Sequence, residues 1–208
     1  MYIKINGKNI ESVWHGPAPD VAPTLIFLHE GLGSVSMWKD FPQKLSHHTG
    51  CGALVYSRFG YGKSEKCELP RPLNFMHEEG LGVLPEIIEL FGIKKYILVG
   101  HSDGASIALI FAGSASANKL LGIVNEAPHV FCESITISSI HKLRENFNSG
   151  NLRARLDKHH IDVDRTFNGW ADVWLNNKFF KWNIESFLPQ IKVPNLIIQG
   201  NNDEYGTS

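Results

Sequence analysis

Five short apolar runs constrain the fold of this chain more than any other feature of its sequence. They occupy residues 24–28, 52–56, 96–99, 121–124 and 195–198. None alternates cleanly with polar residues, which is typical of strands buried on both faces of a parallel sheet. Helical patterns separate the runs, so we predict an α/β fold with a mostly parallel sheet flanked by helices.

Two local patterns add detail to this fold. The Asn6-Gly7 pair between residues 2–5 and 11–14 is typical of a two-residue hairpin turn, so the chain should open with a hairpin. Apolar residues at i, i+3, i+4 and i+7 predict a helix over residues 84–91, and Gly92 is placed to end it.

Residues 129–190 break the alternation, because they hold helical patterns but no buried strand run. Phe167, Trp170, Ala171 and Trp174 share one face of an amphipathic helix, and three of the five tryptophans lie in this segment. We expect a helical cap at 129–190, inserted into a core made of residues 1–128 and 191–208. The alternative is that these aromatic side chains only pack the insertion against the core.

The composition argues against several kinds of partner and site. Twenty basic and 21 acidic residues give a net charge of −1, so we expect neither nucleic acid nor membrane as a partner. No run approaches the roughly 18 apolar residues of a membrane span, and the start has no signal-peptide pattern. Three cysteines cannot all pair, which predicts reduced thiols and a cytoplasmic location. The spacing of glycines and histidines predicts neither a cofactor nor a metal.

The sequence Gly100-His101-Ser102-Asp103-Gly104 is the strongest chemical signal. It follows a predicted strand and precedes a predicted helix over residues 105–111, which is the context of a G-x-S-x-G nucleophile elbow. Such a turn strains its central residue, lifts the Ser102 hydroxyl above the sheet edge and points free helix N–H groups at the same spot. The alternative is an ordinary strand-to-helix turn.

Two further turns follow predicted strands. A glycine-rich loop over residues 29–34 can bring a backbone N–H to the reacting centre, and the N–H of Asp103 can supply a second oxyanion donor. Asp203 follows the last strand, three residues after Gly200, where a carboxylate can orient a histidine. The alternatives are a plain glycine turn and a solvated turn aspartate.

In these features the chain resembles the α/β-hydrolase family over almost its whole length. The resemblance rests on the 29–34 loop, the Ser57-Arg58-Phe59-Gly60-Tyr61-Gly62-Lys63-Ser64 segment, the Ser102 elbow and the 200–203 turn. It is greatest for small cytoplasmic members with a helical cap, which act on esters, lactones or carbon–carbon bonds of β-diketone-like acids. A small-molecule substrate is therefore expected.

The resemblance also implies roles for particular residues. Ser102 would be the nucleophile and Asp203 the triad acid. Gly31 and Asp103 would be the oxyanion-hole donors, with Leu32 as an alternative to Gly31. A serine at the elbow argues against the dehalogenases and epoxide hydrolases of this fold, which use aspartate there.

One departure from the family pattern concerns the general base. The family order is serine, acid, histidine, but the five residues after Asp203 include no histidine. We therefore expect a piece of a longer hydrolase that lacks the last strand, the last helix and the catalytic histidine. Such a chain should hydrolyse activated esters very slowly or not at all. It should also expose apolar surface at its incomplete edge, and that surface can drive self-association.

Some alternatives stay open at this level. His129 follows a predicted strand end and could replace the missing base, and Glu126 is a second candidate for the acid. His101 adjoins the nucleophile but is expected to point the other way. A non-catalytic small-molecule binder and a partner-recruiting module on the same fold are the alternative functions.

Overall fold

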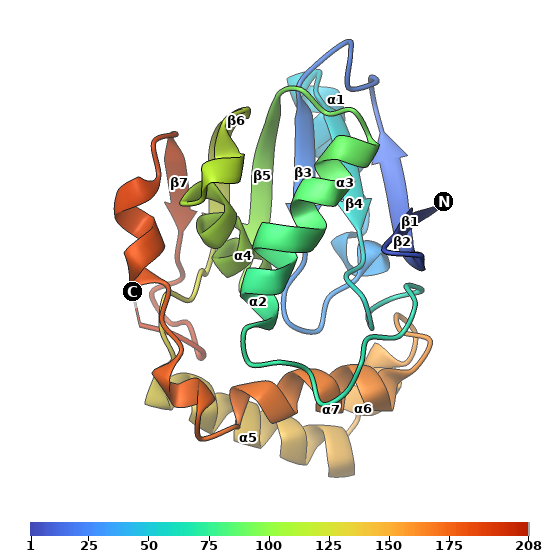
Figure 1. Cartoon of the computed structure of the whole chain (residues 1–208). Coiled ribbons are helices and arrows are strands. Elements are labelled where there is room, and N and C mark those ends of the chain that lie inside the picture. Colours follow the sequence, from blue (N-terminus) through green and yellow to red (C-terminus); the bar gives the residue numbers. More distant parts are fainter. Residues whose placement is uncertain (208) are drawn as a thin grey trace.

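A seven-stranded sheet forms the centre of the computed structural model, which describes residues 1–207 (Figure 1). The strand order is β1-β2-β4-β3-β5-β6-β7. The strands are β1 (Tyr2–Ile5), β2 (Lys8–His15), β3 (Thr24–Leu28), β4 (Gly52–Tyr56), β5 (Tyr96–His101), β6 (Leu120–Glu126) and β7 (Asn195–Ile198). The pairs β4-β3, β3-β5, β5-β6 and β6-β7 are parallel, whereas β1-β2 and β2-β4 are antiparallel. The predicted mostly parallel α/β fold is confirmed.

Helices cover both faces of the sheet and one of its ends (Figure 1). They are α1 (Phe41–Thr49), α2 (Phe75–Glu78), α3 (Leu84–Leu90), α4 (Asp103–Ala112), α5 (Ser134–Ser149), α6 (Leu152–Leu156) and α7 (Val163–Trp174). Shorter helical turns are η1 (Val35–Trp38), η2 (Glu79–Val83), η3 (Ala115–Ala117), η4 (Phe179–Lys181) and η5 (Glu185–Gln190).

Successive side chains of the central strands point to opposite faces of the sheet, as in any β-strand. Ile26 and Leu54 belong to the large core that also contains the apolar residues of α2, α3 and α4. Phe27 and Val55 point to the opposite face, where residues of η1 and α1 cover them. Every residue of β3 is buried, which explains why the sequence shows an unbroken apolar run rather than an alternation.

The opening hairpin has the predicted turn. Asn6 and Gly7 both have positive φ angles, 51° and 78°, which is the conformation that the two-residue turns of twisted hairpins require. The first strand has the predicted bounds, and the second begins three residues earlier than predicted.

The segment from 129 to 190 connects β6 to β7 and contains α5, α6 and α7, the last of which is the predicted amphipathic helix. Figure 1 shows these three helices crossing below the sheet. This is the end where β5 ends and α4 begins, so the helices lie over the carboxyl ends of the parallel strands. In open α/β sheets, ligands bind at that end.

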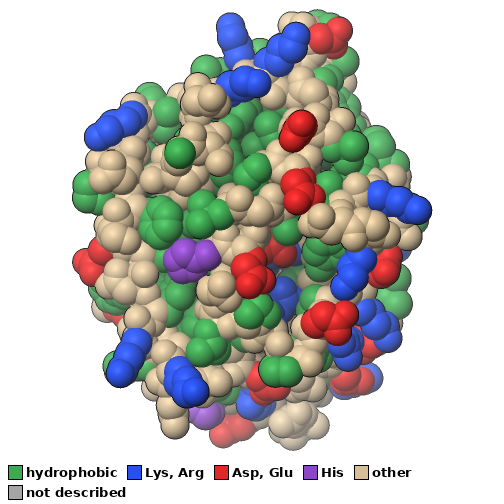
Figure 2. All heavy atoms as spheres, in the orientation of Figure 1, with side chains coloured by type: hydrophobic (Ala, Val, Ile, Leu, Met, Phe, Trp, Pro, Cys, Tyr) green, Lys and Arg blue, Asp and Glu red, His purple; other side chains and the backbone are tan. Residues whose placement is uncertain are grey.

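The outer strand β7 is an exposed edge. It pairs with β6 on one side, and Leu196, Ile197 and Ile198 keep 56%, 55% and 47% of their surface exposed. The face drawn in Figure 2 elsewhere intersperses acidic and basic side chains with apolar ones. Among residues 1–207, no helix combines the length and the apolar character of a membrane span.

Candidate active site

Ser102 occupies a strained turn between β5 and α4. Its backbone angles are φ 52° and ψ −119°, a region that residues with a side chain rarely adopt. Two hydrogen bonds hold the turn: the Ser102 N–H donates to the Glu126 carbonyl (2.8 Å), and the Ser106 N–H donates to the Ser102 carbonyl (3.0 Å). The strand, strained serine and helix predicted from the sequence are all present.

The two glycines of the motif allow this turn to form. A Cβ atom on Gly100 would lie 2.6 Å from the Cα of Ala105, and one on Gly104 would lie 2.0 Å from the Leu28 carbonyl oxygen. The first turn of α4 is therefore pressed against both β5 and the end of β3. This close packing brings Ser102 beside the loop that follows β3.

Ser102 opens into a cavity of about 190 Å³. The cavity lies between the elbow, the loop after β3 and the helices α5 and α7. It is lined by Glu30, Gly31, Leu32, His101, Ser102, Asp103, His129, Thr136, Ile140, Leu143, Trp170, Trp174 and Tyr205. Its combination of apolar walls and polar side chains is typical of a pocket for a small organic ligand.

Trp170 of α7 connects the helical segment to the elbow. Its indole N–H donates to the Asp103 carboxylate (3.0 Å), which is buried. The indole also packs so closely on Gly31 that a Cβ there would lie 2.2 Å from Nε1. Burial raises the pKa of Asp103, and the charge of Arg58 partly opposes that shift. Trp170 therefore contacts both residues whose N–H groups the sequence predicts as oxyanion donors.

The N–H of Asp103 is suited to that role by its position in α4. Asp103 is the first residue of the helix, and N–H groups of a first turn have no partner inside their own helix. The helix dipole adds partial positive charge at the same place. A developing oxyanion beside Ser102 would be stabilised both by the N–H of Asp103 and by the helix dipole.

The expectation that His101 points away from the site is wrong. His101 lines the same cavity as Ser102, and its Nδ1 lies 3.8 Å from the Glu30 carboxylate, an ion-pair distance. The carboxylate raises the pKa of His101 against the effect of burial. Burial alone would raise the pKa of Glu30, but His101 and backbone donors outweigh it and lower that pKa. Glu30, for whose side chain the sequence predicted no role, therefore pairs with the imidazole in the lining of the pocket.

His129 also lines the cavity, and its main chain is fixed one helical turn from the nucleophile. The Ser106 hydroxyl donates to the His129 carbonyl (2.6 Å) and accepts from the His129 N–H (3.0 Å). The ring packs edge-on against Trp174 at 5.1 Å. Burial lowers the pKa of His129, while the Asp103 and Asp203 carboxylates oppose that shift. The neutral imidazole, which can accept a proton, is therefore favoured near neutral pH.

The two candidate acids lie outside the lining of the cavity. The Asp203 carboxylate accepts from the Gln199 side chain (2.9 Å) and from the Tyr205 N–H (2.8 Å), so in this structure it stabilises its own turn. Glu126 ends β6 with an exposed side chain. Its carbonyl nevertheless accepts the hydrogen bond that anchors Ser102.

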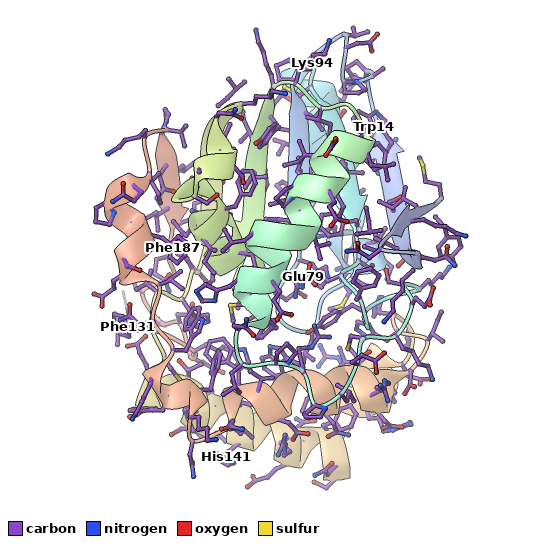
Figure 3. All side chains as sticks on the ribbon, in the orientation of Figure 1. Trp14, Glu79, Lys94, Phe131, His141 and Phe187 are labelled. Carbon is purple, nitrogen blue, oxygen red and sulfur yellow. The ribbon has the colours of Figure 1, made fainter. Side chains whose placement is uncertain are left out.

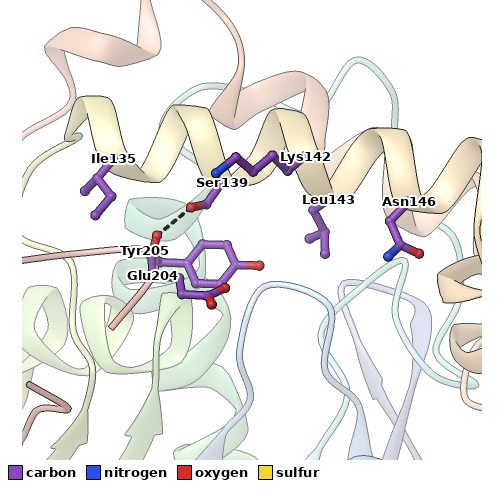
Figure 4. A pocket seen from close by; sticks show the side chains of 7 residues that line it. All are labelled: Ile135, Ser139, Lys142, Leu143, Asn146, Glu204 and Tyr205. Carbon is purple, nitrogen blue, oxygen red and sulfur yellow. Dashed lines mark hydrogen bonds between the residues drawn. The ribbon is translucent and has the colours of Figure 1, made fainter. Parts of the chain in front are cut away.

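A second cavity of about 460 Å³ lies along α5 (Figure 4). Its walls are α5 and the segment that contains Glu204 and Tyr205. The Ser139 hydroxyl donates to the Glu204 carbonyl (2.5 Å), and the Thr136 hydroxyl donates to the Tyr205 carbonyl. Leu143 and Tyr205 line both cavities and form the boundary between them.

The sequence did not identify the buried charged residues beside the site. Arg58, Arg71 and Glu79 are only 1%, 7% and 5% exposed, and Figure 3 labels Glu79 in the turn that joins α2 to α3. Burial raises the pKa of Glu79, and the two arginines oppose that shift. The only sequence feature that involves one of these residues is the 57–64 segment, which contains Arg58. The spacing of residues in that segment does not indicate what the Arg58 side chain contacts.

The comparisons with known proteins bear on the fold and the family of this chain. Over 112 residues, the chain is 25% identical to an epoxide hydrolase B of Mycobacterium tuberculosis; this covers 53% of the chain and 30% of the hydrolase. The matched stretch thus spans less than a third of that curated relative.

Solved structures match along the whole chain. An α/β-hydrolase enzyme, MGS-M2, from a deep-sea metagenome library superposes with a TM-score of 0.72 at 21% identity, covering 100% of this chain and 82% of the other. The enol-lactonase of Burkholderia xenovorans gives a TM-score of 0.73 at 18% identity, covering 100% and 84%. These likenesses show the fold.

The family model for the alpha/beta hydrolase fold matches residues 23–184, which include β3, the elbow and most of the helical segment. Sheet order, strained serine turn and sequence profile therefore converge, and the chain belongs to the α/β-hydrolase family.

Proposed function

We propose that this chain is a serine hydrolase that acts on a small acyl substrate through an acyl-enzyme. The observation that carries the proposal is the backbone of Ser102, strained at φ 52° and exposed to the cavity. His101, Asp103 and His129 line the same cavity. Strain of this kind is found where function requires it.

In the proposed reaction, Ser102 Oγ attacks the substrate carbonyl and gives its proton to a base. The N–H groups of Gly31 and Asp103 stabilise the oxyanion of the tetrahedral intermediate, which collapses and expels the leaving group. Water then hydrolyses the acyl-enzyme. Serine at this position supports acyl transfer rather than the epoxide chemistry named for the curated relative.

Two histidines, His101 and His129, line the cavity and are the candidates for the general base. His101 is engaged by Glu30, whereas burial favours the neutral form of His129. We assign His129 as the base available to Ser102 in these 208 residues, with Asp203 as the acid whose charge faces it. Because Asp203 bonds its own turn instead, we expect slow turnover.

The segment from 129 to 190 would act as the cap of the pocket. Trp170 and Trp174 supply an apolar wall from α7, and the cavity of about 190 Å³ suits a short ester or lactone better than a long acyl chain. The three cysteines are unpaired, which supports a cytoplasmic location.

Acylation of Ser102 tests the proposal directly. The protein is incubated with p-nitrophenyl acetate, and acetylation is followed by intact mass and peptide mapping. We expect one acetyl group on Ser102, formed faster as pH rises through a pKa below 6.5. Ser102→Ala should abolish it, and His129→Gln should slow it about 100-fold. Ser138→Ala, on the exposed face of α5, is the matched control and should change nothing. Absence of an acetyl group on Ser102 would contradict the proposal.

We also propose that β7 pairs with a second copy of the chain, because its open edge carries three exposed aliphatic side chains. Light scattering should show association that Ile197→Lys reduces. A monomer at all concentrations would contradict this.

A further inference from the structure

The carbonyl of Glu30 accepts hydrogen bonds from three donors. The Gly33 N–H lies 3.1 Å away, the His29 ring Nδ1 2.7 Å and the Arg58 Nη2 3.0 Å. Arg58 Nη1 donates to the neighbouring carbonyl of His29 at 2.5 Å. The two terminal nitrogens of the guanidinium therefore donate hydrogen bonds to two consecutive carbonyls of the loop.

The His29 ring completes this arrangement in a single protonation state. Its Nε2 accepts from the Arg58 backbone N–H (3.1 Å), so Nδ1 carries the hydrogen that it donates to Glu30. The ring is fully buried, and burial keeps its pKa well below the ordinary value. A neutral imidazole with one donor and one acceptor satisfies both bonds.

Fixing the Glu30 carbonyl also fixes the next N–H. The peptide between Glu30 and Gly31 is trans, and in a planar trans peptide the C=O and N–H point in opposite directions. The carbonyl faces the buried guanidinium, so the Gly31 N–H faces away from it. Gly31 itself lines the Ser102 cavity.

We propose that Arg58 and His29 are positioning residues that aim the Gly31 N–H at the oxyanion formed on Ser102. The inference rests on the proposed function, and it assigns the first oxyanion donor to Gly31 rather than to Leu32. Neither side chain lines the cavity, so both act through the backbone of the loop.

Arg71 provides a matched control for Arg58. It is also buried and lies over the same Tyr61 ring, at 4.8 Å compared with 4.9 Å for Arg58. Its Nη2 bonds the Phe59 carbonyl and the Cys67 sulfur instead. Replacing each arginine by lysine keeps the charge but removes the fork, so the two variants differ in whether the 29–34 loop loses its anchor.

The experiment follows the Gly31 amide and the acylation rate together. Protein labelled with carbonyl-¹³C glutamate and ¹⁵N glycine gives a correlated NMR signal only for Glu-Gly pairs, which in this sequence are Glu30-Gly31 and Glu79-Gly80. The second pair is an internal reference. Acetylation of Ser102 by p-nitrophenyl acetate is timed on the same samples, and thermal unfolding verifies folding.

We expect Arg58→Lys to move the Gly31 signal more than the Gly80 signal and to slow acetylation about 10- to 100-fold, a part of the roughly 10²–10³ that loss of a whole donor costs. Arg71→Lys should leave the Gly31 signal in place and acetylation within about threefold. An unmoved Gly31 signal, or an unchanged rate, in folded Arg58→Lys would overturn the inference.

Two further outcomes are distinguished from a failure of the inference: a variant that does not fold, and a wild-type protein that is not acetylated. If Arg58→Lys does not fold, His29→Gln decides, since it disturbs another donor of the same carbonyl and should move the same signal and slow acetylation. If the wild-type protein is not acetylated, the proposed function fails, and the Gly31 signal alone then supports or overturns the positioning by Arg58 and His29.

Discussion

The two loops that flank the candidate nucleophile are held in different ways. The elbow at residues 100–104 is held by its own sequence, because its glycines let α4 approach β3 and β5 at backbone contact distance. The 29–34 loop is held by side chains from distant parts of the chain. Arg58 binds two of its carbonyls, the His160 ring donates to the Leu32 carbonyl (2.9 Å), and Trp170 packs on Gly31.

The conformation of the elbow is therefore determined by its own residues, whereas the conformation of the 29–34 loop is determined by residues elsewhere in the chain. A five-residue motif is enough to produce a strained serine once strand and helix form around it. The other proposed oxyanion donor, the N–H of Gly31, depends on residues that come 27 to 139 positions later in the chain. Changes in the elbow should therefore affect folding, whereas changes around the loop should affect the site more than the fold.

Gly104→Ala should have the largest effect. The new methyl group would meet the Leu28 backbone at 2.0 Å, and backbone cannot move aside cheaply, so we expect a loss of about 3 kcal/mol in the free energy of unfolding. Gly82→Ala is the control, since no atom outside its chain neighbours and its own helix backbone lies within 4 Å of its Cβ position; it should stabilise by about 0.5 kcal/mol. Urea unfolding of both variants measures the difference, and equal effects would contradict the local origin of the elbow.

Trp170→Phe should cost about 1–3 kcal/mol, because it removes the donor to a buried carboxylate. Trp174→Phe removes an indole N–H that has no partner among residues 1–207, so it reports the packing loss alone. The same unfolding assay compares them. A smaller loss for Trp170→Phe than for Trp174→Phe would show that the bond to Asp103 does not hold the helical segment to the elbow.

Ser102→Gly should stabilise the fold by about 1 kcal/mol, because glycine adopts a positive φ without strain. Ser102→Ala keeps a Cβ in the same conformation and should change stability little. Thermal unfolding distinguishes the two. If both variants are equally stable, Ser102 is not strained in the folded protein.

The pair of Glu30 and His101 should give the smallest and most pH-dependent effect. The pKa of His101 is raised, so its contribution is full below the ordinary value of 6.5 and is lost as pH rises through the folded value. The pKa of Glu30 is lowered, so its contribution is full above 4.5 and is lost as pH falls through the folded value. Glu30→Gln should therefore cost most between pH 4.5 and 6.5, about 0.5 kcal/mol for this partly exposed pair. A cost that is unchanged at pH 9 would contradict the ion pair.

The sequence predicted the parts of the fold whose signals are local. The runs at 24–28, 52–56 and 195–198 have the predicted bounds, and the elbow has its strained serine. The predicted direction of the His101 side chain is wrong because the alternation of side chains along a strand does not account for the ion-pair contact with Glu30 in another loop. The roles of Arg58 and Trp170 could not be predicted, since a hydrogen bond between residues 28 or 67 positions apart leaves no periodic pattern.

The crowding of tryptophans around the pocket has an optical consequence. Trp170 and Trp174 line the cavity, and Trp182 packs on Trp174 at 6.0 Å, while Trp14 and Trp38 belong to the sheet region. Two of the five tryptophans therefore form part of the wall of the pocket that holds the candidate nucleophile, and a third packs on one of them. A ligand that enters the pocket should change the intrinsic fluorescence, so the protein carries its own reporter of occupancy without an added dye.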